Sequence, residues 1–319
     1  MLVFFTALSY WTQDFDNQQA ILRTLSPSPQ NEMLVIESIM CSSPNIPIKP
    51  PPNNNIRCPQ KPIVTVKQLG QLGNQIYEYI SVWAIAKKTG REPYVPSCMI
   101  QELGKMFRNL PVPPLSYLAY CPLPEHLVAA TVGNLDHSSG NIILPNYIQQ
   151  PKYIAPLLGE IRQIFQFNEH IIDESQKLLH SASRGMENIT YVGVHVRRTD
   201  FVQYLKWRFN TSLVTPDYFL KQMNVFRNKY KPIIFVVLSD DPQWCERELR
   251  GDDVVVMKIN SPAQDLAIMA ACNHSIIDYG TYGMWGAVLS GGDTYVYNNL
   301  TNSAPCSLAS FVPNWYIVT

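Results

Sequence analysis

Residues 190–200 read TYVGVHVRRTD, a short run of apolar and β-branched residues that ends abruptly in charge. Such a run predicts a strand over 191–196 that is buried on both faces, as strands of parallel sheets are. Downstream, the pattern predicts strands at 232–238, 253–259, 274–279 and 294–298, separated by helices at about 216–229, 242–250, 262–273 and 281–290. This alternation predicts an α/β fold with a parallel sheet covered by helices on both faces.

The part of the chain before this region has a weaker pattern. Residues 63–69 (IVTVKQL) predict a strand, residues 70–75 (GQLGNQ) a tight turn, and the following residues a helix that runs to about 88 and stops at Gly90. A further helix is predicted near 157–182, whereas the proline-rich residues 97–150 give no assignment. We therefore predict an N-terminal lobe over 61–188 and a C-terminal lobe over 189–319.

The first 60 residues are predicted to be a tail and stem. Residues 44–62 are dense in proline and asparagine, which favours an extended spacer. Residues 1–11 (MLVFFTALSYW) are apolar but fall short of the roughly 20 residues that span a bilayer. They are interpreted either as a frayed or packed segment or as the remnant of a membrane anchor.

The overall composition excludes two classes of protein. Hydrophobic residues make up 46% of the chain and charged residues 16%, so a sizeable core forms and wholesale disorder is excluded. The formal net charge is zero, which leaves no basic surplus for a nucleic-acid partner. The seven cysteines form no CxxC pair, so their spacing fits buried thiols or disulfides, with at least one cysteine unpaired, better than a zinc site.

Ligands of parallel α/β sheets bind beyond the carboxyl ends of the strands, so we searched each strand end for polar residues. The strongest signal is His195, Arg197, Arg198 and Asp200 in HVRRTD. A guanidinium presents a fixed fork of donors that suits phosphate oxygens and stays charged at any working pH. The alternative is a pair of arginines that is exposed or salt-bridged to Asp200.

A second strand end carries Ser239, Asp240 and Asp241. Their hydroxyl and carboxylates would accept hydrogen bonds from ribose hydroxyls or a guanine edge, or they would cap the next helix. A metal site is a weaker interpretation because no third oxygen ligand lies nearby in sequence.

A third strand end carries Thr281, Tyr282 and Gly283 in GTYGMW. Glycines allow close approach to a ligand, and a helix N-terminus favours a diphosphate. The alternative is an ordinary tight turn between a strand and a helix, which has the same sequence pattern. Asp265 lies in the first turn of its predicted helix, where a carboxylate is often only a partner of the helix dipole. No GxGxxG follows a strand, which disfavours a dinucleotide oxidoreductase, and no GxxxxGK[ST] occurs, which disfavours a nucleotide triphosphatase. The three polar strand ends together predict a nucleotide-diphosphate site.

Several motifs, in this order, resemble the α-1,2-fucosyltransferase family: GQLGNQ (70–75), HVRRTD (195–200), SDDPQWC (239–245), SPAQDLAIMAACNHSI (261–276), GTYGMWGAVLSGGDTYVY (280–297) and PNWY (313–316). The resemblance runs from about residue 63 to the C-terminus and is poor over 97–185. HxRRxD is shared with core α-1,6 and protein O-fucosyltransferases, so it points to GDP-fucose and not to an acceptor. Thr199 is a departure, because many α-1,2 members have glycine there.

The resemblance implies a GT-B-like architecture, with two Rossmann-type lobes, a donor cleft between them and no metal or other cofactor. It places Arg197 at the β-phosphate, with His195, Arg198 and Asp200 shaping the site and Asn74 at the cleft. The implied nucleotide-binding residues are Gly73, Arg197, Ser239, Asp240, Asp241, Asp265, Thr281, Tyr282 and Gly283.

The implied activity is inverting transfer of L-fucose from GDP-β-L-fucose to O2 of a terminal β-galactoside on a glycan. Alternatives are a core α-1,6- or protein O-fucosyltransferase, or a non-catalytic binder of nucleotide sugars. Family members reside in the Golgi lumen as single-pass type II membrane proteins. This chain is therefore expected there, with its anchor shortened or absent.

Overall fold

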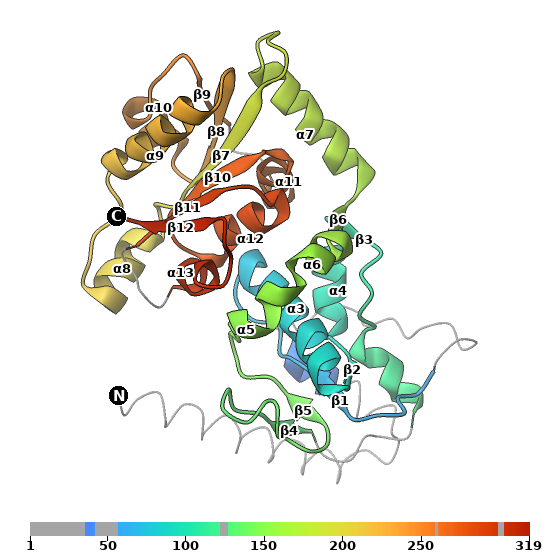
Figure 1. The fold of residues 1–319 in the computed structure, drawn as a ribbon. Coiled ribbons are helices and arrows are strands. Elements are labelled where there is room, and N and C mark those ends of the chain that lie inside the picture. The colour runs from blue at the N-terminus through green and yellow to red at the C-terminus, as the bar shows by residue number, and fades with distance from the viewer. Residues whose placement is uncertain (1–35, 42–56, 122–126, 259–260, 299–302) are drawn as a thin grey trace. The chain divides into compact units, whose positions relative to one another are not determined.

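The computed structural model describes residues 36–41, 57–121, 127–258, 261–298 and 303–319, which divide into two compact units (Figure 1). The first unit comprises residues 1–71, 75–104 and 110–153, and the second comprises 72–74, 105–109 and 154–319. The predicted membrane-anchor segment and most of the predicted stem lie outside the described residues. The lobe boundary at 188 stays a prediction, since the second unit also includes residues 154–188.

The first unit contains a small parallel sheet of four strands in the order β2-β1-β5-β4. Its elements are β1 (Ile63–Thr65), α3 (Leu72–Thr89, shared with the second unit), β2 (Glu92–Pro93), α4 (Ser97–Gly104), η1 (Leu115–Tyr120), β4 (Val128–Ala129), β5 (Ile142–Ile143) and α5 (Pro151–Ile154), after a helical segment at 36–40. The predicted helix before Gly90 is confirmed, but it begins at Leu72, so the prediction of a turn over 70–75 is wrong for residues 72–75, which form the first turn of α3. The helix ends before Gly90 because Gly90 adopts the left-handed conformation (φ 71°) and its N–H closes the last turn on Ala86.

Two disulfides join segments of the first unit. Cys41 pairs with Cys98 and Cys58 pairs with Cys121. The other three cysteines, Cys245, Cys272 and Cys306, are buried free thiols of the second unit. Both interpretations of the cysteine pattern, disulfides and buried thiols, therefore apply within one chain.

The second unit is built on a six-stranded sheet in the order β12-β11-β10-β7-β8-β9, with every neighbouring pair parallel. Its strands are β7 (Thr190–Val196), β8 (Ile233–Ser239), β9 (Val254–Val256), β10 (His274–Ile277), β11 (Thr294–Tyr297) and β12 (Trp315–Val318). The predicted α/β class with parallel sheets is confirmed.

Helices cover both faces of this sheet (Figure 1). The helices of the second unit are α6 (Leu158–Ile164, after the short turn η2, Ala155–Leu157), α7 (Glu169–Ala182), α8 (Phe201–Phe209), α9 (Pro216–Lys229), α10 (Pro242–Glu248), α11 (Pro262–Ala271), α12 (Thr281–Ser290) and α13 (Ala304–Ala309). Successive side chains of β7 point to opposite faces. Val192 and Val194 pack with α9 and α10 in one core cluster, whereas a Cβ at Gly193 would lie 2.8 Å from Met269 of α11.

The prediction of one continuous helix over 157–182 is wrong. The chain leaves the helix at Phe165, whose buried ring packs against Phe107 and Trp285. Residues Gln166–Phe167 then form β6, which pairs antiparallel with β3 (Phe107–Arg108) before α7 begins. Two predicted strands are also shorter than expected: the one at 63–69 ends at Thr65, and the one at 253–259 ends at Val256.

Candidate active site

The three polar strand ends predicted from the sequence meet at one edge of the larger sheet. β10, β7 and β8 are direct neighbours, and all three run in the same direction. The segments that follow them, 197–200, 240–241 and 278–281, therefore emerge side by side.

Arg197 is oriented by two carboxylates. Its Nη2 donates to Asp200 Oδ2 at 2.7 Å, its Nη1 lies 3.7 Å from Asp240 Oδ2, and its guanidinium carbon lies 5.7 Å from the centre of the Phe201 ring. The side chain keeps 25% exposure, so the guanidinium is accessible yet held in place. The predicted ion pair with Asp200 and the predicted anion-binding role are therefore compatible, because the pair fixes the cation at the mouth of the site.

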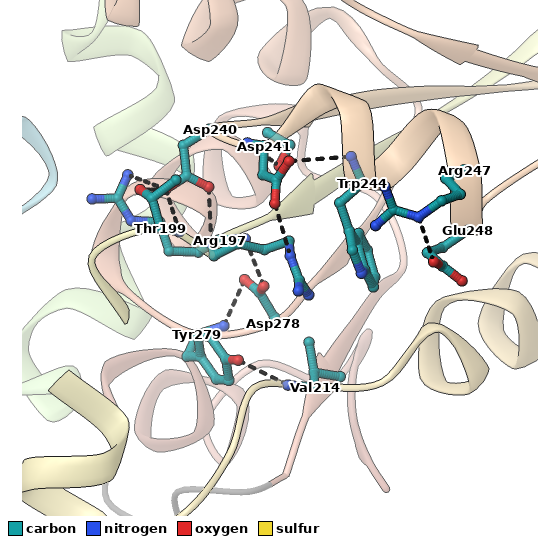
Figure 2. Close-up of polar contacts among 12 residues, drawn as sticks. Arg197, Thr199, Val214, Asp240, Asp241, Trp244, Arg247, Glu248, Asp278 and Tyr279 are labelled. Carbon is teal, nitrogen blue, oxygen red and sulfur yellow. Dashed lines mark hydrogen bonds and ion pairs between the residues drawn. The ribbon is translucent and has the colours of Figure 1, made fainter. Parts of the chain in front are cut away.

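Asp240 binds the backbone of the loop that carries Arg197 and Arg198 (Figure 2). Its carboxylate accepts hydrogen bonds from the backbone N–H groups of Arg198 (2.8 Å) and Thr199 (3.1 Å) and from the Thr199 hydroxyl. Burial acts to raise the pKa of Asp240, but these hydrogen bonds and the charge of Arg197 outweigh it and lower the pKa. Asp240 is thus a carboxylate that shapes the phosphate-facing loop.

Ser239 ends β8, and Asp241 is the N-cap residue of α10. Asp241 caps the helix by accepting from Trp244 N at 3.1 Å, and its own N–H donates to Ser239 Oγ at 3.0 Å. Asp241 also accepts from Arg198 Nε at 3.4 Å, while the Arg198 guanidinium lies 3.8 Å from the Trp244 ring centre. The capping alternative therefore accounts for Asp241, and contact of either residue with a nucleoside stays a prediction.

Asp278 is the residue of this site that the sequence interpretation missed. It is fully buried directly after β10; its Oδ2 accepts from Arg197 N at 2.7 Å and its Oδ1 from Tyr279 N at 2.8 Å (Figure 2). Oδ1 also lies 3.5 Å from His195 Nδ1. Burial raises the pKa of Asp278, and the His195 ring and the two N–H donors offset this only in part. An acidic residue closing an apolar strand was the available signal, but it was interpreted as part of the strand HSIIDY.

His195 is nearly buried and packs closely on the first turn of α12. A Cβ at Gly283 would lie 2.6 Å from His195 Nδ1, so the imidazole occupies the space that a larger residue would need. The Tyr282 ring centre lies 5.5 Å from that of His195. Asp265, in the first turn of α11, contributes to this group through its charge: burial first and then Asp265 raise the pKa of the Tyr282 hydroxyl.

The first turn of α3, which carries Gly73 and Asn74 of GQLGNQ, supplies residues to the same group within the second unit. Thr281 Oγ1 and Asn74 Oδ1 are 3.0 Å apart, and Trp285 Nε1 donates to the Gly73 carbonyl at 2.9 Å. A Cβ at Gly73 would lie 2.6 Å from both Thr281 Oγ1 and Tyr282 N. A glycine is therefore required where this turn meets the N-terminus of α12.

The assembled group combines features suited to an anionic nucleotide. Arg197 provides a fixed cation, and α12 provides a helix N-terminus whose cap, Gly280, offers no side-chain hydrogen bond. Among the residues that the structure describes, no group of three or more His, Cys, Asp or Glu side chains could hold a metal ion. The individual roles predicted for these residues stay predictions.

The chain is similar to a set of known fucosyltransferases. The sequence model of glycosyl transferase family 11 matches residues 35–319. The mouse protein "Galactoside 2-alpha-L-fucosyltransferase Sec1" is 32% identical over 86% of this chain and 77% of its own length. The Pongo pygmaeus "Galactoside alpha-(1,2)-fucosyltransferase 2" is 34% identical over 79% of this chain and 78% of its own length.

A solved structure shares the fold. The NodZ α-1,6-fucosyltransferase soaked with GDP-fucose matches with a TM-score of 0.50 and 13% identity, over 76% of this chain and 97% of its own. This likeness confirms the GT-B-like class. From the family match and the identity to its relatives, we conclude that the chain belongs to glycosyl transferase family 11.

Proposed function

We propose that the chain transfers L-fucose from GDP-β-L-fucose to O2 of a terminal β-galactoside on a glycan. The proposal is supported by the relatives that match most of this chain, which are named as galactoside α-1,2-fucosyltransferases. The observation that carries it is the position of Arg197, held by Asp200 and Asp240 beyond β7 and anchored through its backbone by Asp278.

The proposed reaction is a single displacement. The acceptor O2 bonds to the anomeric carbon of fucose while the bond from that carbon to the β-phosphate oxygen breaks, and the electron pair of that bond passes to the diphosphate. The acceptor hydroxyl releases its proton to solvent as its oxygen becomes the glycosidic oxygen, so the products are the fucoside, GDP and one proton. The β-linked donor thereby gives an α-linked product through an oxocarbenium-like transition state.

The residues of the site would stabilise the charge that develops on the diphosphate. Arg197 would donate two parallel hydrogen bonds to its oxygens, and the N–H groups at the start of α12 would add partial positive charge. Removing one such preorganised donor typically costs about 3–4 kcal/mol of transition-state stabilisation. His195 and Asp278 would keep the donor loop in the geometry that this requires.

The test is Arg197→Lys, which keeps the charge but loses the fork. We expect turnover of labelled GDP-fucose on lactose, with EDTA present, to fall by about a hundredfold or more. Arg247→Lys is the matched control, because Arg247 is 59% exposed and, among the described residues, forms an ion pair only with Glu248 of its own helix. Near-normal turnover by Arg197→Lys would reject the role of Arg197.

The acceptor is tested separately with the native chain. Parallel assays with a β-galactoside, an N-glycan and a folded peptide domain should give transfer to the galactoside alone. Transfer to either of the others would reject the α-1,2 assignment while keeping the donor site. Absence of transfer to all three, with intact GDP binding, would identify a non-catalytic binder.

We further propose that the chain works in the lumen of the secretory pathway. Its two disulfides support an oxidising compartment, and glycan acceptors occur there. Within the described residues, no helix has the length and apolar character needed to cross a membrane.

A further inference from the structure

The second unit contains a cavity of about 420 Å³ that the proposed reaction does not use. It is lined by Val202 and Lys206 of α8, by residues 211–216, and by Arg198 and Trp244. Its volume is within the range of small-molecule sites, roughly 300–1,000 Å³. Arg198 is the only predicted site residue that lines it.

The charge of the cavity wall is positive. Arg198 and Lys206 line it, and no lining residue carries a carboxylate. The Arg198 guanidinium is held on one side by Asp241, through Nε, and across its face by the Trp244 ring. Its two terminal nitrogens make no hydrogen bond with any residue that the structure describes, so the donor fork is available to a ligand.

Lys206 adds a second, adjustable cation. It follows Val202 by one helical turn on α8, so both side chains lie on the same helix face and line the cavity. Lys206 is exposed and forms no ion pair with another described residue. A flexible ammonium and a fixed guanidinium that line the same cavity are suited to an anionic group of a small ligand.

The rest of the wall suits a ring that carries hydroxyl groups. Thr211, Ser212 and Thr215 contribute hydroxyls, and Leu213 and Trp244 contribute apolar surface. Thr215 is the N-cap residue of α9, but its side chain makes no capping hydrogen bond. Its hydroxyl is therefore not committed to the helix.

We infer that this cavity binds a monosaccharide-sized organic anion, such as a sugar acid or a sugar phosphate. The guanidinium and ammonium would hold the carboxylate or phosphate, and the hydroxyls and apolar wall would hold the ring. The inference goes beyond the proposed function, since the ligand is neither the donor nor the galactoside.

The cavity and the proposed donor site receive different side chains of the same loop. Arg197 turns to Asp200 and Asp240, whereas Arg198 turns to Asp241 and Trp244. The cavity wall is nevertheless connected to the site, because Val214 N donates to the Tyr279 hydroxyl at 2.9 Å, next to Asp278 (Figure 2). Because the two sites use different side chains, the anion and a nucleotide would bind at the same time.

The experiment is titration calorimetry of the full chain with glucuronate and with glucose 6-phosphate, using glucose as the neutral control. We expect at least one acid to bind about tenfold or more tightly than glucose, since hydrogen bonds to charged groups are the stronger ones. We expect the same affinity in the presence of saturating GDP. If only one acid binds, the result identifies the anionic group and supports the inference.

Lys206→Gln should weaken this binding by about tenfold. Lys221→Gln makes the same change on α9 and should leave the affinity unchanged, because this lysine is exposed and its only hydrogen bond to a described residue is with the Thr319 carbonyl. Equal binding of glucose, displacement of the acid by GDP, or unchanged affinity in Lys206→Gln would each overturn the inference. None of these outcomes depends on whether the enzyme transfers fucose.

Discussion

Asp278 supports two residues of the proposed donor site from beneath. One carboxylate oxygen accepts from the backbone of Arg197, and the other faces the imidazole of His195. Because the side chain is fully buried, no water can replace either contact. Its role is to position groups that would contact the nucleotide.

Asp278→Asn should therefore impair catalysis more than folding. An amide keeps one acceptor oxygen but turns an NH₂ group toward a backbone N–H that now lacks an acceptor. We expect turnover to fall about tenfold or more, measured with labelled GDP-fucose. Asp293→Asn is the control, since Asp293 forms an ion pair near the surface with Lys229. Normal turnover in Asp278→Asn would contradict a positioning role.

Glu78, in α3, makes stability depend on pH. Burial raises its pKa to about 8, although its Oε2 accepts from Leu69 N at 3.0 Å. Between the unfolded pKa of 4.5 and the folded value of about 8, the folded chain retains a proton that the unfolded chain has lost. The free energy of unfolding consequently falls as pH rises through this window.

Glu78→Gln removes this pH dependence and keeps an acceptor for Leu69. Relative to the native chain, the variant should gain on the order of 3 kcal/mol in the free energy of unfolding between pH 5 and pH 8. Urea denaturation at the two pH values measures this difference. Glu246→Gln, at an exposed position, should show none. A constant difference between Glu78→Gln and the native chain would show that Glu78 is ionised throughout.

The residue types at the site could be predicted, but their division of labour could not. The sequence identified His195, Arg197 and Asp240, because charge at the end of an apolar strand is unusual. It could not distinguish side chains that contact a ligand from side chains that bond to the protein itself, since a carboxylate in the pattern SDDP can either cap a helix or accept from a nucleotide. Asp278 was missed because burial is predicted from the spacing of several apolar residues, and a single buried acid does not change that spacing.

At the scale of elements, the site depends on how closely α12 approaches its neighbours. Gly283 places α12 against the His195 ring, and Gly73 places the first turn of α3 against the N-terminus of α12. These contacts are too short for any side chain larger than hydrogen. Both glycines are thus required by packing between elements, with no positive φ at either position.

Gly283→Ala tests this close approach. Alanine favours a helix interior by roughly 0.5–1 kcal/mol, but its Cβ would lie 2.6 Å from His195 Nδ1 and would displace the ring. We expect a loss of GDP affinity and of turnover that exceeds any change in Tm. Gly159→Ala in α6, with no atom within 4 Å of the added Cβ, should behave as the native chain or be slightly more stable. Retained GDP affinity in Gly283→Ala would show that His195 can move without consequence.

The predicted elements were most accurate where strands and helices alternate. The helices at 216–229 and 281–290 have the predicted bounds, and the sheet that they cover is parallel as expected. The sequence did not predict α8, α13 or β12, and it joined α6 to α7. The break at Phe165 is tertiary in origin, since it depends on the pairing of β6 with β3 and on aromatic contacts distant in sequence.

For the whole molecule, covalent stabilisation is confined to one of the two units. The disulfides close loops with sequence separations of 57 and 63 residues in the first unit, and the second unit has only thiols. Loops of this length correspond to about 4 kcal/mol each in the chain-entropy model. The pairing itself could not be predicted, because spacing does not define connectivity.

Reduction should therefore destabilise the two units unequally. With dithiothreitol, we expect amide hydrogen exchange to accelerate in β1 and α3 while β7 and β8 keep their protection. The three buried thiols should resist alkylation until the second unit unfolds. Equal acceleration in both units would show that their stabilities are not independent.

The two bridges interleave along the chain: Cys58 lies between Cys41 and Cys98, and Cys98 lies between Cys58 and Cys121. During synthesis from the N-terminus, Cys41 and Cys58 appear before the other two bridged cysteines, so neither has its correct partner yet. Because a short loop closes more readily than a long one, their mutual pairing is the favoured early error. Maturation should consequently depend on a disulfide isomerase, and an overexpression host that lacks one should accumulate the mispaired form.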